Sequence, residues 1–202
     1  MATEKPTRKT EYRSSLRSKR LIISAFLELL GEKEFDRITV TEIAERADLN
    51  RRTFYAHYSD VRAVMDEIEE RASEQIIGFI REINSIEFWT DPISLFTQIT
   101  DYLKKDQYMY RIMLNASTSA SFVTRLQREF ADYMRTLPYL PAELRQTQDY
   151  LNRAYFYAGG IANLYVMWFR GELGGTLEDV ANTLTKMIMS DPLIADLSGA
   201  TE

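Results

Sequence analysis

The chain has 202 residues, of which 45% are hydrophobic, with a single histidine and no cysteine. This composition is that of a globular protein, and the missing cysteines exclude disulfide frameworks, thiolate metal sites and cysteine nucleophiles. The formal net charge of −5 does not exclude a nucleic-acid partner, because the charge that binds DNA is local rather than global.

Positive charge is concentrated at the amino terminus. Residues 1–20 carry seven basic and two acidic side chains, and residues 1–62 have a net charge of +3, so residues 63–202 have −8. No run of apolar residues approaches the ~20 that a membrane helix requires. The charged amino terminus also lacks the apolar segment of a secretory signal. We therefore expect no membrane partner and a cytoplasmic location.

The amino-terminal residues differ from the rest of the chain. Residues 1–15 have almost no apolar side chains, which predicts a mobile basic arm. From residue 16 onward, apolar side chains recur at the spacing of one helix face: Leu16, Ile23, Phe26, Leu27 and Leu30. Gly31 is expected to end this first helix.

Two short helices joined by a tight turn are predicted next. Thr39, with Glu42 three residues later, has the pattern of a capping box, in which each side chain binds the other residue's backbone amide. The turn formers at residues 48–50 break this helix, and Asn50 is a good cap for a third helix over about 51–57. This is a helix-turn-helix pattern.

The third helix has one face to bury, and Phe54 and Tyr58 are the expected inward pair. Its outward side chains combine guanidinium groups, hydroxyls and an imidazole: Arg51, Arg52, Thr53, Tyr55, Ala56 and His57. Such a surface suits phosphates and base edges better than it suits packing.

The remainder of the chain is expected to be helical. A long helix should run over about 60–84, and breaks at 90–92, 115–117, 138–141 and 171–175 divide the later residues into further helices, without the alternation of a β-strand. We predict an all-α protein of about nine helices. The expected parts are the arm at 1–15, a DNA-binding domain at 16–60 and a larger domain at 61–202.

The segment ITVTEIAERADLNRRTFYAHYSD, residues 38–60, resembles the DNA-binding segment of the TetR/AcrR family of bacterial regulators. The positions that match the family pattern are Thr39, Val40, Ile43, Ala44, Ala47, Leu49, Thr53, Phe54, Tyr55, His57 and Tyr58. Residues 155–188 resemble the last two helices of a ligand-domain subgroup common in Firmicutes. The resemblance implies a three-helix DNA-binding module followed by a helical domain that binds a ligand and pairs subunits.

The resemblance also implies roles for individual residues. Tyr55 and His57 would hold phosphates. A further set would lie at or close to base edges in the major groove: Thr41, Arg51, Arg52, Thr53 and Ala56. The chemistry agrees, because arginine can bond guanine bidentately.

Two positions depart from the family pattern. Val61 replaces a usual lysine that grips a phosphate at the start of the fourth helix, and Arg62 beside it is a possible substitute. Asp48 replaces the usual glycine of the turn, and aspartate tolerates unusual backbone angles less well than glycine.

Homodimerisation is expected, because paired half-sites ~34–36 Å apart are the usual geometry for this motif. The expected dimer surface lies on helices at about 144–170 and 176–190, and the resemblance implies a four-helix bundle built from these two helices of each subunit. Its candidate residues are Tyr155, Gly159, Gly160, Tyr165 and Trp168. Packing within one chain is the alternative explanation for the glycines.

A small-molecule effector of unknown identity is expected in the larger domain, with no cofactor and no metal. Candidate lining residues are Phe88, Trp89, Phe96, Tyr102, Tyr108, Met109, Met113, Phe122, Tyr133, Phe156 and Asn163. Aromatic and methionine side chains at helical spacing are more often ordinary core.

The sequence thus predicts a DNA-binding transcriptional regulator that acts as a ligand-responsive repressor on a palindromic operator. A co-activator or partner-recruiting protein of the same fold, with weak or no DNA binding, is the alternative. An enzyme is not expected, because one histidine, no cysteine and no glycine-rich phosphate loop leave little for catalysis.

Overall fold

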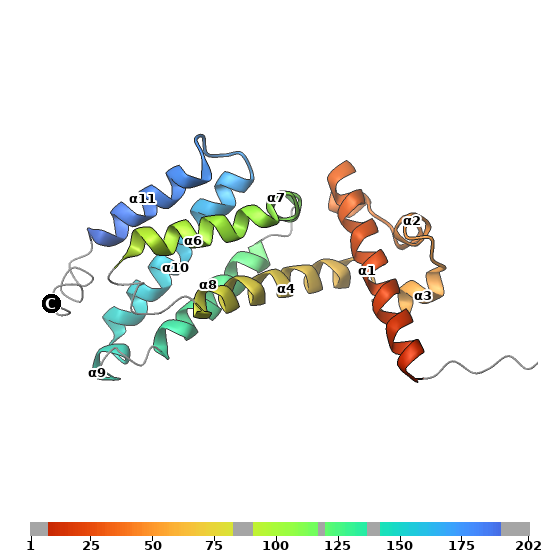
Figure 1. Ribbon diagram of the computed structural model, residues 1–202, viewed down its shortest axis with the longest axis horizontal. Coiled ribbons are helices and arrows are strands. Elements are labelled where there is room, and N and C mark those ends of the chain that lie inside the picture. The colour runs from red at the N-terminus through yellow and green to blue at the C-terminus, as the bar shows by residue number, and fades with distance from the viewer. Residues whose placement is uncertain (1–7, 83–90, 117–119, 137–141, 191–202) are drawn as a thin grey trace, which may run out of the picture. The chain divides into compact units, whose positions relative to one another are not determined.

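The computed structural model describes residues 8–82, 91–116, 120–136 and 142–190. Every regular element in these ranges is a helix, and the all-α prediction is confirmed (Figure 1). The chain forms two compact units, unit 1 up to residue 70 and unit 2 from residue 71. We describe each unit by itself.

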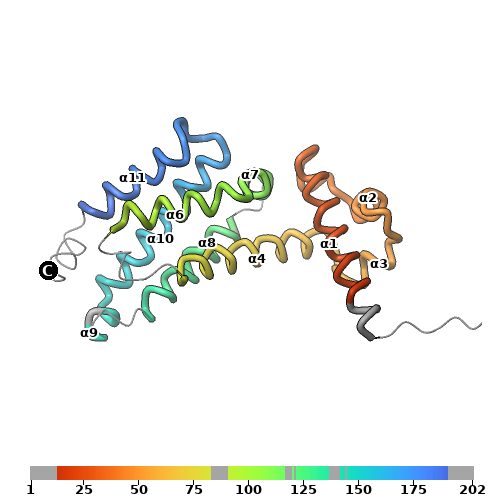
Figure 2. Tube along the Cα trace, viewed as in Figure 1, coloured from red at the N-terminus to blue at the C-terminus, as the bar shows by residue number. Residues whose placement is uncertain are grey.

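Unit 1 is built on a long first helix. Its elements are α1 (Arg8–Glu32), the 3₁₀ turn η1 (Phe35–Arg37), α2 (Val40–Arg46), α3 (Arg51–Tyr55) and the first part of α4 (Val61–Glu82). Helix α1 packs against both α2 and α3 (Figure 2). Phe26 of α1, Ile43 of α2 and Phe54 of α3 are completely buried and form the centre of this small core.

Helix α1 is longer at both ends than the sequence pattern predicts. It begins at Arg8, so residues 8–15 belong to a helix rather than to an arm, and residues 1–7 lie outside the described residues. The segment after Pro6 has no helix breaker, and its charged residues are good helix formers that extend a helix already held by packing. Gly31 does not end the helix, because the buried Leu29 and Leu30 offset the cost of about 1 kcal/mol that a helical glycine carries.

The division between the units falls inside α4, ten residues after the expected boundary at 60–61. The cap of α4 is Asp60, whose Oδ1 accepts the backbone N–H of Ala63 at 2.8 Å. The first turns of α4 belong to unit 1, in which Lys19 Nζ of α1 lies 2.7 Å from Glu67 Oε2.

Unit 2 contains the rest of α4 and six further described helices: α6 (Pro92–Lys105), α7 (Gln107–Asn115), α8 (Ala120–Arg135), α9 (Ala142–Arg145), α10 (Gln148–Phe169) and α11 (Leu177–Met189). Helix α10 packs on α8, α7 and α11, and α11 lies along α6 (Figure 1). The expected last helix corresponds to α11, which Thr176 and Asp179 begin with a capping box.

Two breaks in unit 2 are absent from the sequence prediction. Asp106, with φ −123° and ψ 34°, separates α6 from α7 within a segment that the pattern predicts as one helix. Helix α10 begins at Gln148 rather than near residue 144, because Thr147 Oγ1 accepts the backbone N–H of Tyr150 at 3.2 Å. Neither break changes the apolar spacing, and the one at Thr147 is set by a local side-chain hydrogen bond.

None of the helices in the described ranges has the length and apolarity needed to cross a membrane.

Candidate nucleic-acid interface

Helix α2 is fixed to α1 by its charged side chains. Thr39 Oγ1 accepts the backbone N–H of Glu42 at 3.3 Å and Glu42 Oε2 accepts that of Thr39 at 3.0 Å, which confirms the predicted capping box. Lys33 donates to Glu42, and this bond, with those from Thr39, lowers the pKa of Glu42 to about 2. Arg46 donates to both oxygens of Glu32 at 2.8 and 2.9 Å, which raises the pKa of Arg46 and lowers that of Glu32.

The turn after α2 has the hydrogen bonds of a Schellman motif. The N–H of Leu49 donates to Ala44 O at 2.9 Å, and the N–H of Asp48 donates to Glu45 O at 3.1 Å. Asp48 has a φ of 52°, the left-handed conformation in which this motif usually has glycine. Aspartate is among the non-glycine residues that adopt it most readily, so the turn forms despite the departure from the family pattern.

Helix α3 is held at its start by Asn50. Its Oδ1 accepts the backbone N–H of Thr53 at 2.8 Å and the Thr53 hydroxyl at 3.0 Å. The Thr53 hydroxyl, expected at a base edge, therefore donates within the protein and is left with its oxygen as an acceptor. Phe54 and Tyr58 are buried, as the sequence predicts.

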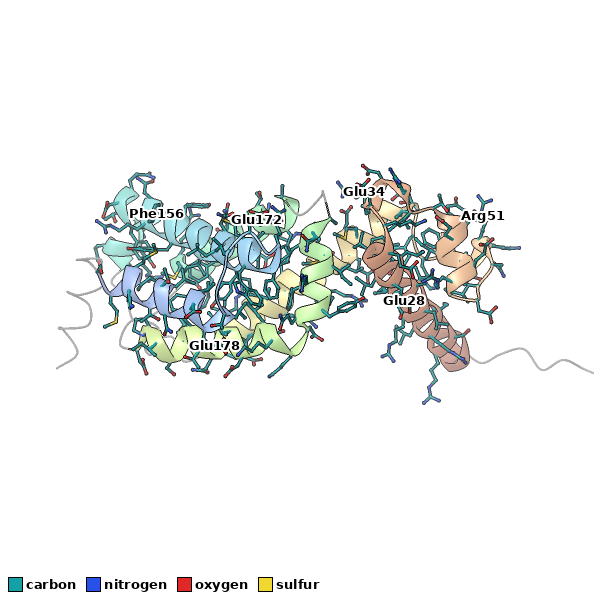
Figure 3. All side chains as sticks on the ribbon, turned by 90° about the horizontal axis from the view of Figure 1, so that it is seen from above. Glu28, Glu34, Arg51, Phe156, Glu172 and Glu178 are labelled. Atoms are coloured by element: carbon teal, nitrogen blue, oxygen red, sulfur yellow. The ribbon has the colours of Figure 1, made fainter. Side chains whose placement is uncertain are left out.

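The two arginines of α3 are exposed and available. Within the described residues, neither Arg51 nor Arg52 forms an ion pair with a carboxylate. Figure 3 shows the Arg51 side chain extending away from the ribbon of α3. The other expected DNA contacts that are exposed are Thr41, Tyr55 and Ala56.

His57 is not a free surface imidazole. Its Nε2 lies 2.8 Å from Ser18 Oγ of α1, and the side chain is half-buried. Burial, and next the charge of Lys19, lower the pKa of His57, so the ring is neutral at pH 7. The predicted phosphate contact would therefore use a neutral imidazole. Ser18 was not among the candidates, because it is 39 residues away in sequence and no local pattern joins the two.

The start of α4 provides no free cation in place of the family lysine. The Arg62 guanidinium lies over the Phe35 ring, 5.3 Å from its centroid, and its Nε is 3.9 Å from Asp66. Val61 is half-buried. Arg62 is thus engaged within unit 1.

A row of arginines on α1 adds positive charge to unit 1. Arg13, Arg17 and Arg20 are all exposed. Their spacing of four and three residues places them on one face of the helix. That face is opposite to the one that carries the buried Ile22 and Phe26, so the arginine side chains do not pack in the core.

In unit 2 the helices α4, α6, α7, α8 and α10 surround an apolar cavity of about 80 Å³. Phe96 and Phe122, both candidates from the sequence, line it. Tyr108 and Phe156 do not, since they are 72% and 74% exposed. Both were wrong as lining residues, because the apolar pattern does not tell which aromatic side chains face inward.

The other predicted ligand residues lie elsewhere in unit 2. Tyr102 stacks on Phe79 with ring centroids 4.4 Å apart, and Tyr133 lies under the Arg81 guanidinium at 5.9 Å. Three further candidates are also absent from the cavity wall: Met109, Met113 and Asn163. Asn163 is exposed and donates to the Met167 sulfur. Phe88 and Trp89 lie outside the described residues.

The predicted dimer residues on α10 divide into exposed and internal groups. Tyr155 and Gly160 are exposed. Tyr165 is buried and lines the cavity, so its prediction as a surface residue was wrong. A Cβ at Gly159 would lie 3.1 Å from Gln127 Nε2 of α8. This close approach supports the alternative explanation, in which the glycine serves packing within one chain. Trp168 Nε1 donates to Gly175 O at 3.1 Å.

Two family models match the sequence of this chain. One, described as bacterial regulatory proteins of the tetR family, matches residues 22–72. The other, TetR_C_8, described as a transcriptional regulator C-terminal region, matches residues 90–190. The chain belongs to the TetR family. Members of this family are transcription factors rather than enzymes.

Two relatives of this TetR-family protein are described as HTH-type transcriptional regulators. It is 26% identical over 148 residues to an HTH-type transcriptional regulator of Haemophilus influenzae, a match that covers 71% of each chain. It is 25% identical over 120 residues to the HTH-type transcriptional regulator YxbF of Bacillus subtilis, covering 58% of this chain and 28% of YxbF.

Solved structures show the same fold. A TetR transcriptional regulator from Streptococcus agalactiae is 20% identical, with a TM-score of 0.59 over 88% of this chain and 96% of that one. A TetR-family regulator from Syntrophomonas wolfei is 15% identical, with a TM-score of 0.64 over 84% of this chain and 92% of that one. The dihydroxyacetone kinase operon activator DhaS is 17% identical, with a TM-score of 0.52 over 89% and 96%.

Proposed function

We propose that this TetR-family regulator is a ligand-responsive repressor that binds a palindromic operator as a homodimer. The observation that carries the DNA contact is the pair Arg51 and Arg52, exposed on α3 and without an ion pair among the described residues. Arginine binds guanine bidentately in the major groove. The Asn50 cap and the turn at Asp48 hold α3 in place for this contact.

The exposed arginines of α1 support the phosphate contacts. Arg13, Arg17 and Arg20 share one face, and phosphate contacts by such residues position a protein on DNA without reading its sequence. Their positive charge compensates for Arg62, which is engaged within unit 1, and for Val61, which carries no charge.

The homodimer is supported by exposed apolar side chains on α10 and α11. Phe156 and Tyr155 of α10 and Met187 and Met189 of α11 are exposed large apolar side chains in unit 2. Figure 3 shows Phe156 extending outward from its helix. Gly160 adds an open position, since a Cβ there would meet no atom within 4 Å. Phe156 and Gly160 are four residues apart and share one face of α10, which a second copy of the helix would cover.

The response to a ligand is supported by the cavity of unit 2. Ile76, Ile77 and Ile80 of α4 form part of its wall, so a bound molecule would contact the same helix that Asp60 starts in unit 1. Release from the operator requires that the ligand bind the operator-free conformation more tightly than the operator-bound one.

DNA binding is tested with fragments of the gene's own upstream region. We expect a specific complex whose affinity falls steeply between about 50 and about 200 mM salt. The double variant R51A/R52A should lose it, whereas R128A, which removes an exposed arginine of α8, should retain it. Equal binding by R51A/R52A and the parent protein would contradict the proposed contact.

The alternative of a partner-recruiting protein rests on Val61 and on Arg62, which is held by Phe35 and Asp66. The absence of any specific complex, with the dimer intact, would favour this alternative.

A further inference from the structure

The wall of the cavity in unit 2 is almost entirely apolar. Its lining comes from helices distant in sequence and includes Ile77, Phe96, Phe122, Leu126, Ala162 and Val166. Its volume is about 80 Å³, enough for a small guest. Apolar cavities accept apolar molecules, because a guest restores the dispersion contacts that the wall atoms lack.

The chemistry of the wall restricts what can occupy it. Tyr165 supplies the one side-chain oxygen among the lining residues, and this hydroxyl lies 3.1 Å from Thr100 Oγ1, with which it forms a buried hydrogen bond. Burial raises the pKa of Tyr165 to about 12, so the phenol is neutral at physiological pH. A charged group moved into this space would lose its hydration and gain no partner.

We propose that this cavity binds a small, uncharged molecule through a hydrocarbon portion, an alkyl chain or an unsubstituted ring. The proposal rests on the proposed function in taking this guest as the effector. It goes further by naming the ligand's chemical class and by excluding anions and cations.

The lining residues also show how such a guest would be detected. Five isoleucines from three helices line the cavity: Ile76, Ile77, Ile80, Ile99 and Ile161. Ile22 and Ile43 are buried in unit 1 and are not among the lining residues, so they serve as internal controls. Methyl resonances of the isoleucines therefore report on the cavity and on unit 1 in one experiment.

The test uses the full chain with isotopically labelled isoleucine methyl groups. The protein is titrated with 1-hexanol and, in a separate experiment, with hexanoate at about pH 7.5, and the methyl signals are followed by NMR. We expect 1-hexanol to shift the methyl signals of the cavity isoleucines by more than those of Ile22 and Ile43. Hexanoate has the same chain length and a charge, and should bind at least about tenfold more weakly. Equal affinity for both compounds, or shifts outside the cavity alone, would overturn the proposal.

Variants locate the binding. Ala162→Leu fills the cavity and should abolish the 1-hexanol shifts, whereas Ala142→Leu, on the exposed surface of α9, should retain them. Ile161→Phe fills the space from a neighbouring position and takes the place of Ala162→Leu if that variant does not fold. Tyr165→Phe should retain binding within about threefold, because the hydroxyl is bonded to Thr100 rather than to the guest.

The titration contains no DNA, so its result is independent of the repressor proposal. A salt-dependent operator complex without 1-hexanol binding would overturn the cavity inference and leave repression standing. Binding of 1-hexanol in the cavity without any effect on the operator complex would support the cavity chemistry and overturn the effector role.

Discussion

His57 Nε2 at the end of the DNA-binding segment lies 2.8 Å from Ser18 Oγ of α1. This contact joins residues that are 39 positions apart and holds the carboxyl end of the α3 region against α1. Loss of one hydrogen bond of this kind costs about 1 kcal/mol. We expect Ser18→Ala to lower the free energy of unfolding by about that amount and to weaken operator binding severalfold, measured by urea unfolding and fluorescence anisotropy. Ser24→Ala, on the exposed part of the same helix, is the control.

The pKa of His57 also predicts how stability depends on pH. Burial lowers this pKa below its ordinary value of 6.5, so the folded state binds the proton less tightly than the unfolded state does. The resulting stability is present above the unfolded pKa and is lost as the pH falls through the folded pKa. Between about pH 7.5 and about pH 5, the parent protein should therefore lose more unfolding free energy than His57→Gln does. Equal losses in urea unfolding would contradict this assignment.

The left-handed conformation of Asp48 predicts a stabilising substitution. Glycine adopts a φ of 52° without steric cost, so Asp48→Gly should raise the free energy of unfolding by about 0.5–1 kcal/mol. Asp48→Ala should lower it by about 1 kcal/mol, because alanine is strained in this region. Asp48→Asn removes the charge but tolerates the conformation, and separates the backbone effect from electrostatics. A more stable Asp48→Ala would refute the explanation.

The arginines of α1 and α3 should affect DNA binding in different ways. Arg13→Ala/Arg17→Ala should weaken specific and non-specific binding alike and reduce the salt slope by about 4, because each of the four arginines removed from the dimer neutralises one phosphate. Arg51→Ala/Arg52→Ala should instead reduce discrimination between the operator and unrelated DNA. Anisotropy titrations at several salt concentrations on both kinds of DNA measure the two effects. An unchanged slope for the α1 variant would remove that helix from the interface.

The exposed surface of α10 predicts where the dimer can be disrupted. Phe156→Glu should shift the protein toward the monomer by at least about tenfold in dissociation constant, because a buried charge at an apolar interface has no partner. Tyr108→Glu changes an equally exposed aromatic residue of α7 and should leave the dimer intact. Sedimentation equilibrium distinguishes the two. A monomeric Tyr108→Glu with a dimeric Phe156→Glu would place the interface on α7.

The amino-terminal module was predictable from sequence because its signals act over a few residues. The capping box of Thr39 and Glu42, the Asn50 cap and the inward pair Phe54 and Tyr58 all depend on side chains within one or two helical turns. The helix-turn-helix could therefore be located without any knowledge of the rest of the chain.

Other features were decided by tertiary packing alone. Helix α10 has apolar residues on most sides, so periodicity could not tell that Tyr165 faces the cavity while Phe156 faces outward. The contact of His57 with Ser18 and the cavity itself join helices that are far apart in sequence. The sequence alone thus determined the helix-turn-helix that presents Arg51 and Arg52. Which apolar side chains pack together, and where they leave space, was decided only when the helices came together, because burial depends on neighbours that no local pattern specifies.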